Sequence, residues 1–531
     1  MTNKLIKYPL NNWKLNFCLV VLVYIVAHIP MLLSNGVWWD DWTVWNVTGE
    51  SLYAYLGPNN ANEVCQYTYI KLITKLFSTG SQIYIFHLIS FIVHGISLLC
   101  FWFILKKITT DIGFTTMCSL LIASFGMDTT SMLIICSHYA FANCFFFIGL
   151  LTLIYEAYNE KPYLLFITGI TWLCSLLIWR SAAMLMPFCL LTLSFFKTNI
   201  QLKDFKSWLN SIKYVFVHYW QIIVIVSIFI PLYILYFGPA GSYSAEYTPR
   251  LKNVITSPIT SIISAIISVP LFIKECINGY YGGGNFYLIL LSIFISCLIY
   301  SIMSLSIKEK SDYKWIAVIS LLYLAVSTIL QLWIYSYLEI VDISEYRSRV
   351  LSLGALPISI IVTYLLCFLP HKVKKVSFAI LLSGSMLFTM YSYIDYIYAF
   401  SKSEIVAEYF HDNDELKNKQ IRLIDYSYEY NENKSTLRYY AYEGMSRMAY
   451  GQDSHTKIES VYRPCYGEEF VPDYVLYIEP TRFQISTFEK CQHVFYKLIY
   501  KHTGKFQNNY KDYLNDMLII HHEKITVLGS N

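Results

Sequence analysis

The sequence predicts a polytopic α-helical membrane protein with about eleven transmembrane helices, followed by a C-terminal extracytoplasmic α/β domain. Three observations support this fold class. Of the 531 residues, 56% are apolar and 17% are aromatic. Only 14% are charged, against about 25% in a soluble domain. Apolar stretches long enough to cross a bilayer recur as far as residue 400, and the composition then becomes polar and rich in tyrosine.

The apolar stretches are separated by polar segments that are alternately rich and poor in lysine. The expected spans are residues 16–33, 81–105, 112–125, 134–155, 163–179, 182–196, 220–237, 286–307, 315–338, 350–369 and 376–400. Lysines and arginines concentrate on the cytoplasmic side of a membrane. With this count every lysine-rich loop falls on one side, so we expect a cytoplasmic N-terminus and an extracytoplasmic C-terminus.

Two further segments, and the nature of the first span, complete the expected membrane part. The first apolar stretch lacks a small-residue cleavage pattern, which predicts a retained signal anchor. Residues 69–77 have the pattern of an amphipathic helix lying on the outer surface. Residues 259–273 are apolar and bounded by Pro258 and Pro270. We expect this piece to be interfacial or re-entrant, because a full span there would place the later basic clusters outside.

The change of composition divides the chain into a transmembrane catalytic domain, residues 1–400, and an extracytoplasmic soluble domain, residues 401–531. About 130 residues suffice for a small α/β domain. Within it, residues 403–419 have a helical pattern and residues 471–478 a strand pattern. Cys465 and Cys491 could pair in an oxidising compartment, although their spacing alone does not establish a disulfide.

Two adjacent carboxylates, Asp40 and Asp41, follow the first expected span and stand among Trp38, Trp39 and Trp42. Carrying ionised carboxylates into hydrocarbon costs several kcal/mol, so the pair must lie at the far membrane face or in a wet cavity. This makes the pair a candidate functional site. The alternative is an interfacial belt of tryptophans with solvated aspartates beside it.

The order of features in residues 1–190 resembles that of the GT-C superfamily of integral-membrane glycosyltransferases. Members carry an acidic pair in the first outer loop, where Asp40 and Asp41 stand, and then a surface helix and a second span. That span contains His87 and His94 here. Residues 176–187 are similar to a segment where the family places a Lys-Glu pair and a proline. Arg180 supplies the cation there, but Ser181 replaces the acid, whose role is therefore not carried over.

The resemblance implies a GT-C-like fold and a hexosyltransferase that uses a polyprenyl-phosphate-linked sugar. The enzyme would transfer a monosaccharide from this donor to a cell-surface glycan, such as O-antigen or another lipid-linked polysaccharide. The transfer would invert the anomeric centre of the sugar. The reaction would take place on the outer face of a bacterial inner membrane. The expected partners are the donor, the glycan acceptor and membrane lipid, with no nucleic acid. The sugar, the linkage and the oligomeric state stay open.

Glycosyl transfer needs a carboxylate at the acceptor hydroxyl and cations at the departing phosphate. Asp40 and Asp41 suit the first task, and the sequence does not decide between them. The candidates for binding the donor phosphate are Arg347, Arg349, Lys71 and Arg180. Arginine forks match phosphate oxygens. The alternative for each is snorkelling toward lipid head groups.

Asp128 and His138 lie on a short outer turn and are candidates for binding substrate, as are Trp39 and Trp42. No metal-ligand spacing occurs, so we expect no cofactor, with a divalent cation as the less favoured alternative. His87 and His94 fall on one helical face and are expected to be buried packing or hydrogen-bonding residues.

Three other functions stay open. An O-antigen polymerase or ligase would account for Arg347 and Arg349, but it gives no reason for an acidic pair after the first span. A transporter or flippase of lipid-linked sugar would be expected to show internal repeats and charged residues deep within the spans, and neither is seen. A protein could also replace the glycan as acceptor.

Overall fold

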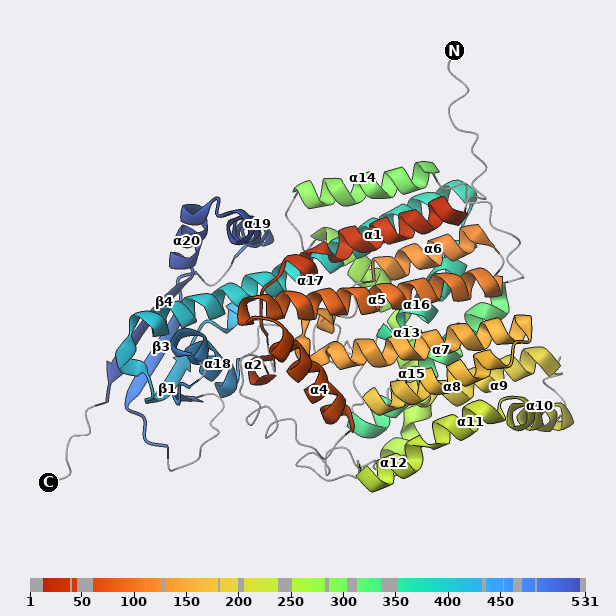
Figure 1. Ribbon diagram of the computed structural model, residues 1–531. Helices are drawn as coiled ribbons and strands as arrows, with labels where there is room; N and C mark the ends of the chain where they lie inside the picture. Colours follow the sequence, from red (N-terminus) through yellow and green to blue (C-terminus); the bar gives the residue numbers. More distant parts are fainter. Residues whose placement is uncertain are drawn as a thin grey trace, which may run out of the picture.

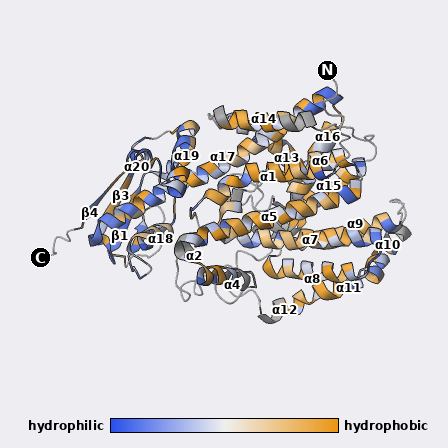
Figure 2. Cartoon of the chain, turned by 45° about the horizontal axis from the view of Figure 1, so that its top comes forward, coloured by the Kyte–Doolittle hydropathy of each residue, from blue (hydrophilic) through white to orange (hydrophobic). Residues whose placement is uncertain are grey.

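The protein is mostly helical, with a small mixed sheet near the C-terminus (Figure 1). The computed structural model describes residues 13–38, 41–44, 61–109, 111–125, 129–179, 182–198, 205–236, 251–281, 286–302, 313–335, 352–431, 436–451, 453–461, 470–482 and 485–525. Most helices pack side by side as a bundle, and a lobe that contains the sheet lies at one end of it. Figure 2 shows that hydrophobic residues dominate the bundle helices, whereas the lobe is more hydrophilic.

The first half of the chain forms most of the bundle. Its helices are α1 (Trp13–Leu33), α2 (Asp41–Val44), α4 (Ala61–Leu76), α5 (Thr79–Thr109), α6 (Ile112–Ala123), α7 (Ser137–Asn159), α8 (Tyr163–Ile178), α9 (Leu185–Thr198), α10 (Phe205–His218), α11 (Trp220–Ser227) and α12 (Phe229–Tyr236). Two 3-10 turns, η1 (Thr129–Met132) and η2 (Ile134–Cys136), join α6 to α7. The surface helix expected at residues 69–77 is the second half of α4.

The bundle is completed by α13 (Leu251–Tyr281), α14 (Phe286–Ile302), α15 (Lys314–Tyr335), α16 (Ala355–Leu366) and α17 (His371–Asp412). Among the described residues, α1, α5, α7, α13 and α17 are long and apolar enough to cross a membrane. A pair bent by 68°, Trp208–His218 and Trp220–Leu232, is a sixth candidate span. These helices support a multi-pass membrane protein. Within the same described part of the chain, six more apolar helices are shorter, so the count of eleven spans stays a prediction.

Two predicted helix limits differ from the structure. The piece expected at residues 259–273 is part of one longer helix, because α13 runs through both Pro258 and Pro270. Since α13 is long and apolar enough to cross a membrane, the structure does not favour the interfacial or re-entrant placement expected for this piece. Each proline removes one backbone hydrogen bond, and an apolar helix packed among neighbours tolerates that loss. The span expected to end at Phe400 and the helix expected to begin at Ser403 are one continuous helix, α17. The expected domain boundary therefore falls inside a helix that continues from the bundle into the lobe (Figure 1).

The lobe is built on a four-stranded sheet of order β2-β1-β3-β4. Its strands are β1 (Gln420–Asp425), β2 (Lys457–Ser460), β3 (Tyr474–Pro480) and β4 (Leu518–Lys524). β1 pairs in parallel with β2 and β3, and β4 runs antiparallel to β3. β3 confirms the strand expected at residues 471–478. The helices of the lobe are α18 (Tyr439–Tyr450), α19 (Thr487–Thr503) and α20 (Gln507–Asn515).

One hydrophobic core joins the bundle to the lobe. It contains Trp38 and Trp42 from the segment after α1, the C-terminal half of α17, and the inward residues of the sheet. Alternation along β1 puts Ile421 and Leu423 into this core at 0% exposure. The segment that follows the first helix is thus packed against the last third of the chain.

Within the bundle, α13 and α17 cross at two glycines. A Cβ atom on Gly384 would lie 2.0 Å from the carbonyl oxygen of Cys276, and one on Gly279 would lie 2.3 Å from the carbonyl oxygen of Gly384. Both contacts are with backbone atoms, which cannot rotate away. Small residues allow this close approach between helices in a membrane.

We predict that Gly384→Ala destabilises the protein by about 1–3 kcal/mol, because the added methyl group forces the two backbones apart. The midpoint of thermal unfolding in detergent measures this effect. Gly95→Ala is the matched control, since its Cβ atom would meet Tyr24 at an ordinary 3.5 Å. Equal midpoints for the two variants would contradict the close crossing.

Candidate functional site

The segment after α1 folds into a closed turn. The amide of Gly36 donates to Ser34 Oγ at 3.2 Å. The amide of Asp41 donates to the carbonyl oxygen of Trp38 at 2.9 Å, and Asp41 Oδ2 accepts from the amide of Trp38 at 3.4 Å. Asp41 begins α2 and is 0% exposed. Its carboxylate therefore holds the turn closed in this conformation.

Trp38 attaches the turn to α17. Its indole Nε1 donates to the carbonyl oxygen of Tyr396 at 2.6 Å. Its ring stacks on His87 at 5.8 Å between centroids and meets Phe400 edge-on at 6.1 Å. Trp42 stacks on the same Phe400 at 6.2 Å. Both indoles are 1% exposed, so the turn presents its aromatic side to α17 and not to lipid.

The lobe covers the other side of the turn through α18. A Cβ atom on Gly444 would lie 2.4 Å from Cε3 of Trp42, which shows how closely the helix backbone approaches the ring. Arg447 Nη2 donates to the carbonyl oxygen of Trp42 at 3.3 Å. Trp42 is therefore enclosed between α17 and α18, and Asp41 is buried at the junction of bundle and lobe.

His87, on α5, fixes the turn from a third direction. Its Nδ1 lies 3.0 Å from the carbonyl oxygen of Ser34, and its Nε2 lies 3.1 Å from that of Met132. The ring thus links the end of α1 to η1. It serves as a buried hydrogen-bonding residue, as expected from the sequence.

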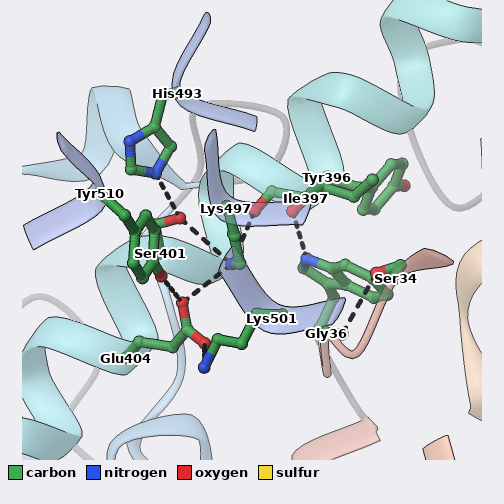
Figure 3. Close-up of polar contacts among 11 residues, drawn as sticks. Ser34, Gly36, Tyr396, Ile397, Ser401, Glu404, His493, Lys497, Lys501 and Tyr510 are labelled. Carbon is green, nitrogen blue, oxygen red and sulfur yellow. Dashed lines mark hydrogen bonds and ion pairs between the residues drawn. The ribbon is translucent and has the colours of Figure 1, made fainter. Parts of the chain in front are cut away.

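A cluster of polar and charged side chains, the α17–α19 cluster, joins Ser401 and Glu404 of α17 to Lys497 and Lys501 of α19 (Figure 3). Lys497 Nζ lies 4.8 Å from the Phe400 ring centroid. It pairs with Glu404 Oε2 at 2.9 Å and donates to Ser401 Oγ at 3.2 Å. Lys501 pairs with Glu404 Oε1 at 3.1 Å.

Two more side chains complete the α17–α19 cluster. Tyr510 OH donates to Glu404, and His493 Nε2 lies 2.8 Å from Ser401 Oγ. Burial, together with the charge of Lys497, lowers the pKa of His493 to about 3. His493 is therefore neutral at physiological pH. Burial also lowers the pKa of Lys497, and Glu404 opposes that change.

A second cluster, the α17–β1 cluster, joins α17 to the sheet. Lys402 Nζ pairs with Asp425 Oδ2 at 2.6 Å and donates to Asn431 Oδ1 at 2.7 Å. Tyr442 OH donates to the same carboxylate. Burial raises the pKa of Asp425, but Lys402 and the hydrogen bonds outweigh it, so that the pKa lies below its ordinary value. Each buried charge here has an opposite charge beside it.

The structure brings together only part of the predicted site. Asp41 and Trp42 lie in the enclosed turn. Lys71 lies on the exposed side of α4. His138 is 8% exposed at the start of α7, with its ring 4.1 Å from that of Tyr139 and 5.4 Å from that of Trp179. The other candidates lie outside the described residues: Asp40, Trp39, Asp128, Arg180, Arg347 and Arg349.

Sequence reasoning did not identify the residues that enclose the turn. Tyr396 and Phe400 stand four apart on α17, a spacing that indicates a shared helical face but not its partner. Gly444 and Arg447 carry no motif. Of the proposed disulfide, Cys491 is buried on α19, and Cys465 lies outside the described residues. No group of three or more potential metal ligands occurs among the residues that the structure describes.

Gly444→Ala is expected to loosen the lobe, because the new methyl group overlaps the Trp42 ring. An overpacked contact of this kind costs about 1–3 kcal/mol. Limited proteolysis of the detergent-solubilised protein should release fragments of the lobe faster than from wild type. Met448→Ala, at a partly exposed position of the same helix, is the control. If both variants are cleaved at the wild-type rate, α18 does not press on Trp42.

The buried neutral His493 predicts a pH dependence of the lobe. Its folded pKa, about 3, lies below the ordinary value of 6.5, so between these values the unfolded state binds one more proton. The contribution of His493 to the free energy of unfolding is therefore fully present above pH 6.5. It falls by about 1.4 kcal/mol for each pH unit below that value. Pulse proteolysis in urea at about pH 5 and about pH 7 measures the difference. His493→Gln should reduce the difference in free energy of unfolding between these two pH values by about 2 kcal/mol. An unchanged pH dependence in this variant would contradict the burial of a neutral imidazole.

The acidic turn is held between α17 and α18, and aromatic side chains surround it. Asp41 can fix the backbone of the turn, and its buried carboxylate cannot meet an acceptor hydroxyl in this conformation. Any direct contact with substrate therefore depends on neighbouring residues or on movement of the lobe.

No protein-family model matches the chain, and no curated protein matches it.

Proposed function

We propose that the protein is a GT-C-like membrane glycosyltransferase. It transfers a monosaccharide from a polyprenyl-phosphate-linked donor to a cell-surface glycan on the outer face of a bacterial inner membrane. The observation that carries the proposal is the acidic turn after α1, held between α17 and α18 where bundle and lobe meet. A bilayer protein gains little from burying a carboxylate there unless the turn has a function.

The distribution of lysines supports placing this turn on the outer face. Lys106 lies 4.0 Å from the ring of Trp13, at the opposite end of α1 from the turn. Lys197 ends α9. Figure 1 shows these helix ends, and α10, at the end of the bundle away from the lobe. Since positive residues stay on the cytoplasmic side, the turn and the lobe belong outside.

In this proposal the two aspartates have different roles. Asp40 accepts the proton of the acceptor hydroxyl or orients it, while Asp41 positions the turn through its bonds to Trp38. Trp42 helps to enclose the turn. The cations for the departing phosphate are proposed to be Arg347 and Arg349, with Arg180 and Lys71 as further candidates.

The proposal makes a direct prediction for cells that express the protein. Asp40→Asn should abolish the sugar decoration made by wild type, because loss of a general base costs about 10²–10⁴-fold in rate. Asp41→Asn should weaken it and also lower the midpoint of thermal unfolding. Glycan analysis by mass spectrometry, at matched membrane levels, measures both. Asp414→Asn is the control, because Asp414 is exposed and follows the C-terminal end of α17.

A decoration that persists in Asp40→Asn would contradict the proposed role of the turn. A second assay separates the enzyme from its rivals. Purified protein given a polyprenyl-phosphate sugar should form a glycosidic bond and release polyprenyl phosphate. A polymerase or ligase would require a glycan donor, and a transporter would move the lipid without forming a bond.

A further inference from the structure

A large cavity lies in the bundle on the side away from the acidic turn. It has a volume of about 670 Å³ and is lined by α5, α7, α9, α15 and α16. Its lining is mostly apolar. Volumes of about 300–1,000 Å³ are typical of ligand pockets. The transferase proposal makes no use of this cavity.

The exposure of the lining shows where the cavity opens. Leu150, Tyr323 and Leu356 are 7%, 7% and 6% exposed, so they form a closed inner end. Tyr158 and Trp315 are 54% and 56% exposed, so they form an open rim. From residue 150 to residue 158, α7 rises about 12 Å. The cavity thus extends from the middle of the bundle to the end that carries the lysines.

The rim combines aromatic rings with cations. Lys197 lines it and is 33% exposed, with Nζ 3.8 Å from Glu160 Oε1. The Glu160 side chain is 84% exposed, so this pair is weak and Lys197 can bind another anion. Lys107 Nζ lies 4.8 Å from the ring of Tyr158. Tryptophan, tyrosine and lysine together are typical of the head-group level of a bilayer.

We propose that the cavity binds a hydrocarbon chain of an anionic bilayer phospholipid, whose head group is held at the rim by Lys197. The apolar interior accounts for the chain, and the cation accounts for the anionic head group. The exposed aromatic rim places both at the boundary between hydrocarbon and head groups. This binding is independent of the proposed transferase activity, because it requires no turnover and none of the acidic turn.

Native mass spectrometry and thermal unfolding in neutral detergent test the proposal. Wild type should retain a phospholipid, and added phosphatidylglycerol should raise its unfolding midpoint more than phosphatidylcholine with the same chains. Ser320→Phe places a ring inside the cavity. If this ring displaces two methylene groups of the bound hydrocarbon chain, the affinity for phospholipid should fall about tenfold. Leu322→Phe, on an exposed side of α15, is the matched control and should bind as wild type does.

Lys197→Gln tests the head group separately and does not disturb the interior. It should bind both lipids equally, whereas Lys75→Gln, on exposed α4, should keep the preference for phosphatidylglycerol. The proposal is overturned if wild type shows no such preference, or if Lys197→Gln retains it. It is also overturned if Ser320→Phe and Leu322→Phe bind lipid alike, or if the retained lipid is a polyprenyl phosphate.

Discussion

The hydrogen bond from the Trp38 indole to the carbonyl oxygen of Tyr396 is the contact on which the rest of the site depends. It joins the segment after the first helix to the last helix of the bundle, across 358 positions of sequence. Because Trp38 is fixed, its backbone can form two hydrogen bonds with Asp41. Trp42 then reaches the space between α17 and α18. The acidic turn is therefore shaped by a helix that belongs to both the bundle and the lobe.

Buried charges determine how the lobe is oriented on α17. Lys402 and Glu404 lie two positions apart on the helix, so their side chains point in different directions. Lys402 pairs with Asp425 of the sheet, and Glu404 pairs with Lys497 of α19. Removing one partner of a buried pair costs about 3–5 kcal/mol, because the other charge is left uncompensated. These two pairs favour one rotation of the lobe about α17, the one that brings Gly444 onto Trp42.

The sequence allowed the membrane helices and one strand to be predicted, because each depends on a local pattern of apolar residues. It failed where tertiary packing overrode a local signal. Pro258 and Pro270 suggested the limits of a short apolar piece, but α13 continues through both. The polar residues after Phe400 suggested a boundary, but α17 continues to Asp412, since its polar side chains find partners in the lobe.

The candidate site shows the same division. The aspartates after the first helix could be identified from their cost in a bilayer. Their surroundings could not, because Tyr396, Phe400 and Gly444 reach the turn only through the folded lobe. The glycine has no motif at all, and only its contact with Trp42 reveals why a side chain is absent there.

Amide hydrogen exchange of Gly36, Trp38 and Asp41 tests the clamped turn most directly. It is measured in wild type and in Ile405→Pro, which interrupts α17 where the helix packs against the lobe. A proline inside a helix costs about 3 kcal/mol or more. If the turn is clamped, these amides exchange slowly in wild type and faster in the variant, while exchange in α5 and α7 stays the same. Fast exchange of these amides in wild type, or slow exchange in both proteins, would contradict the clamped turn.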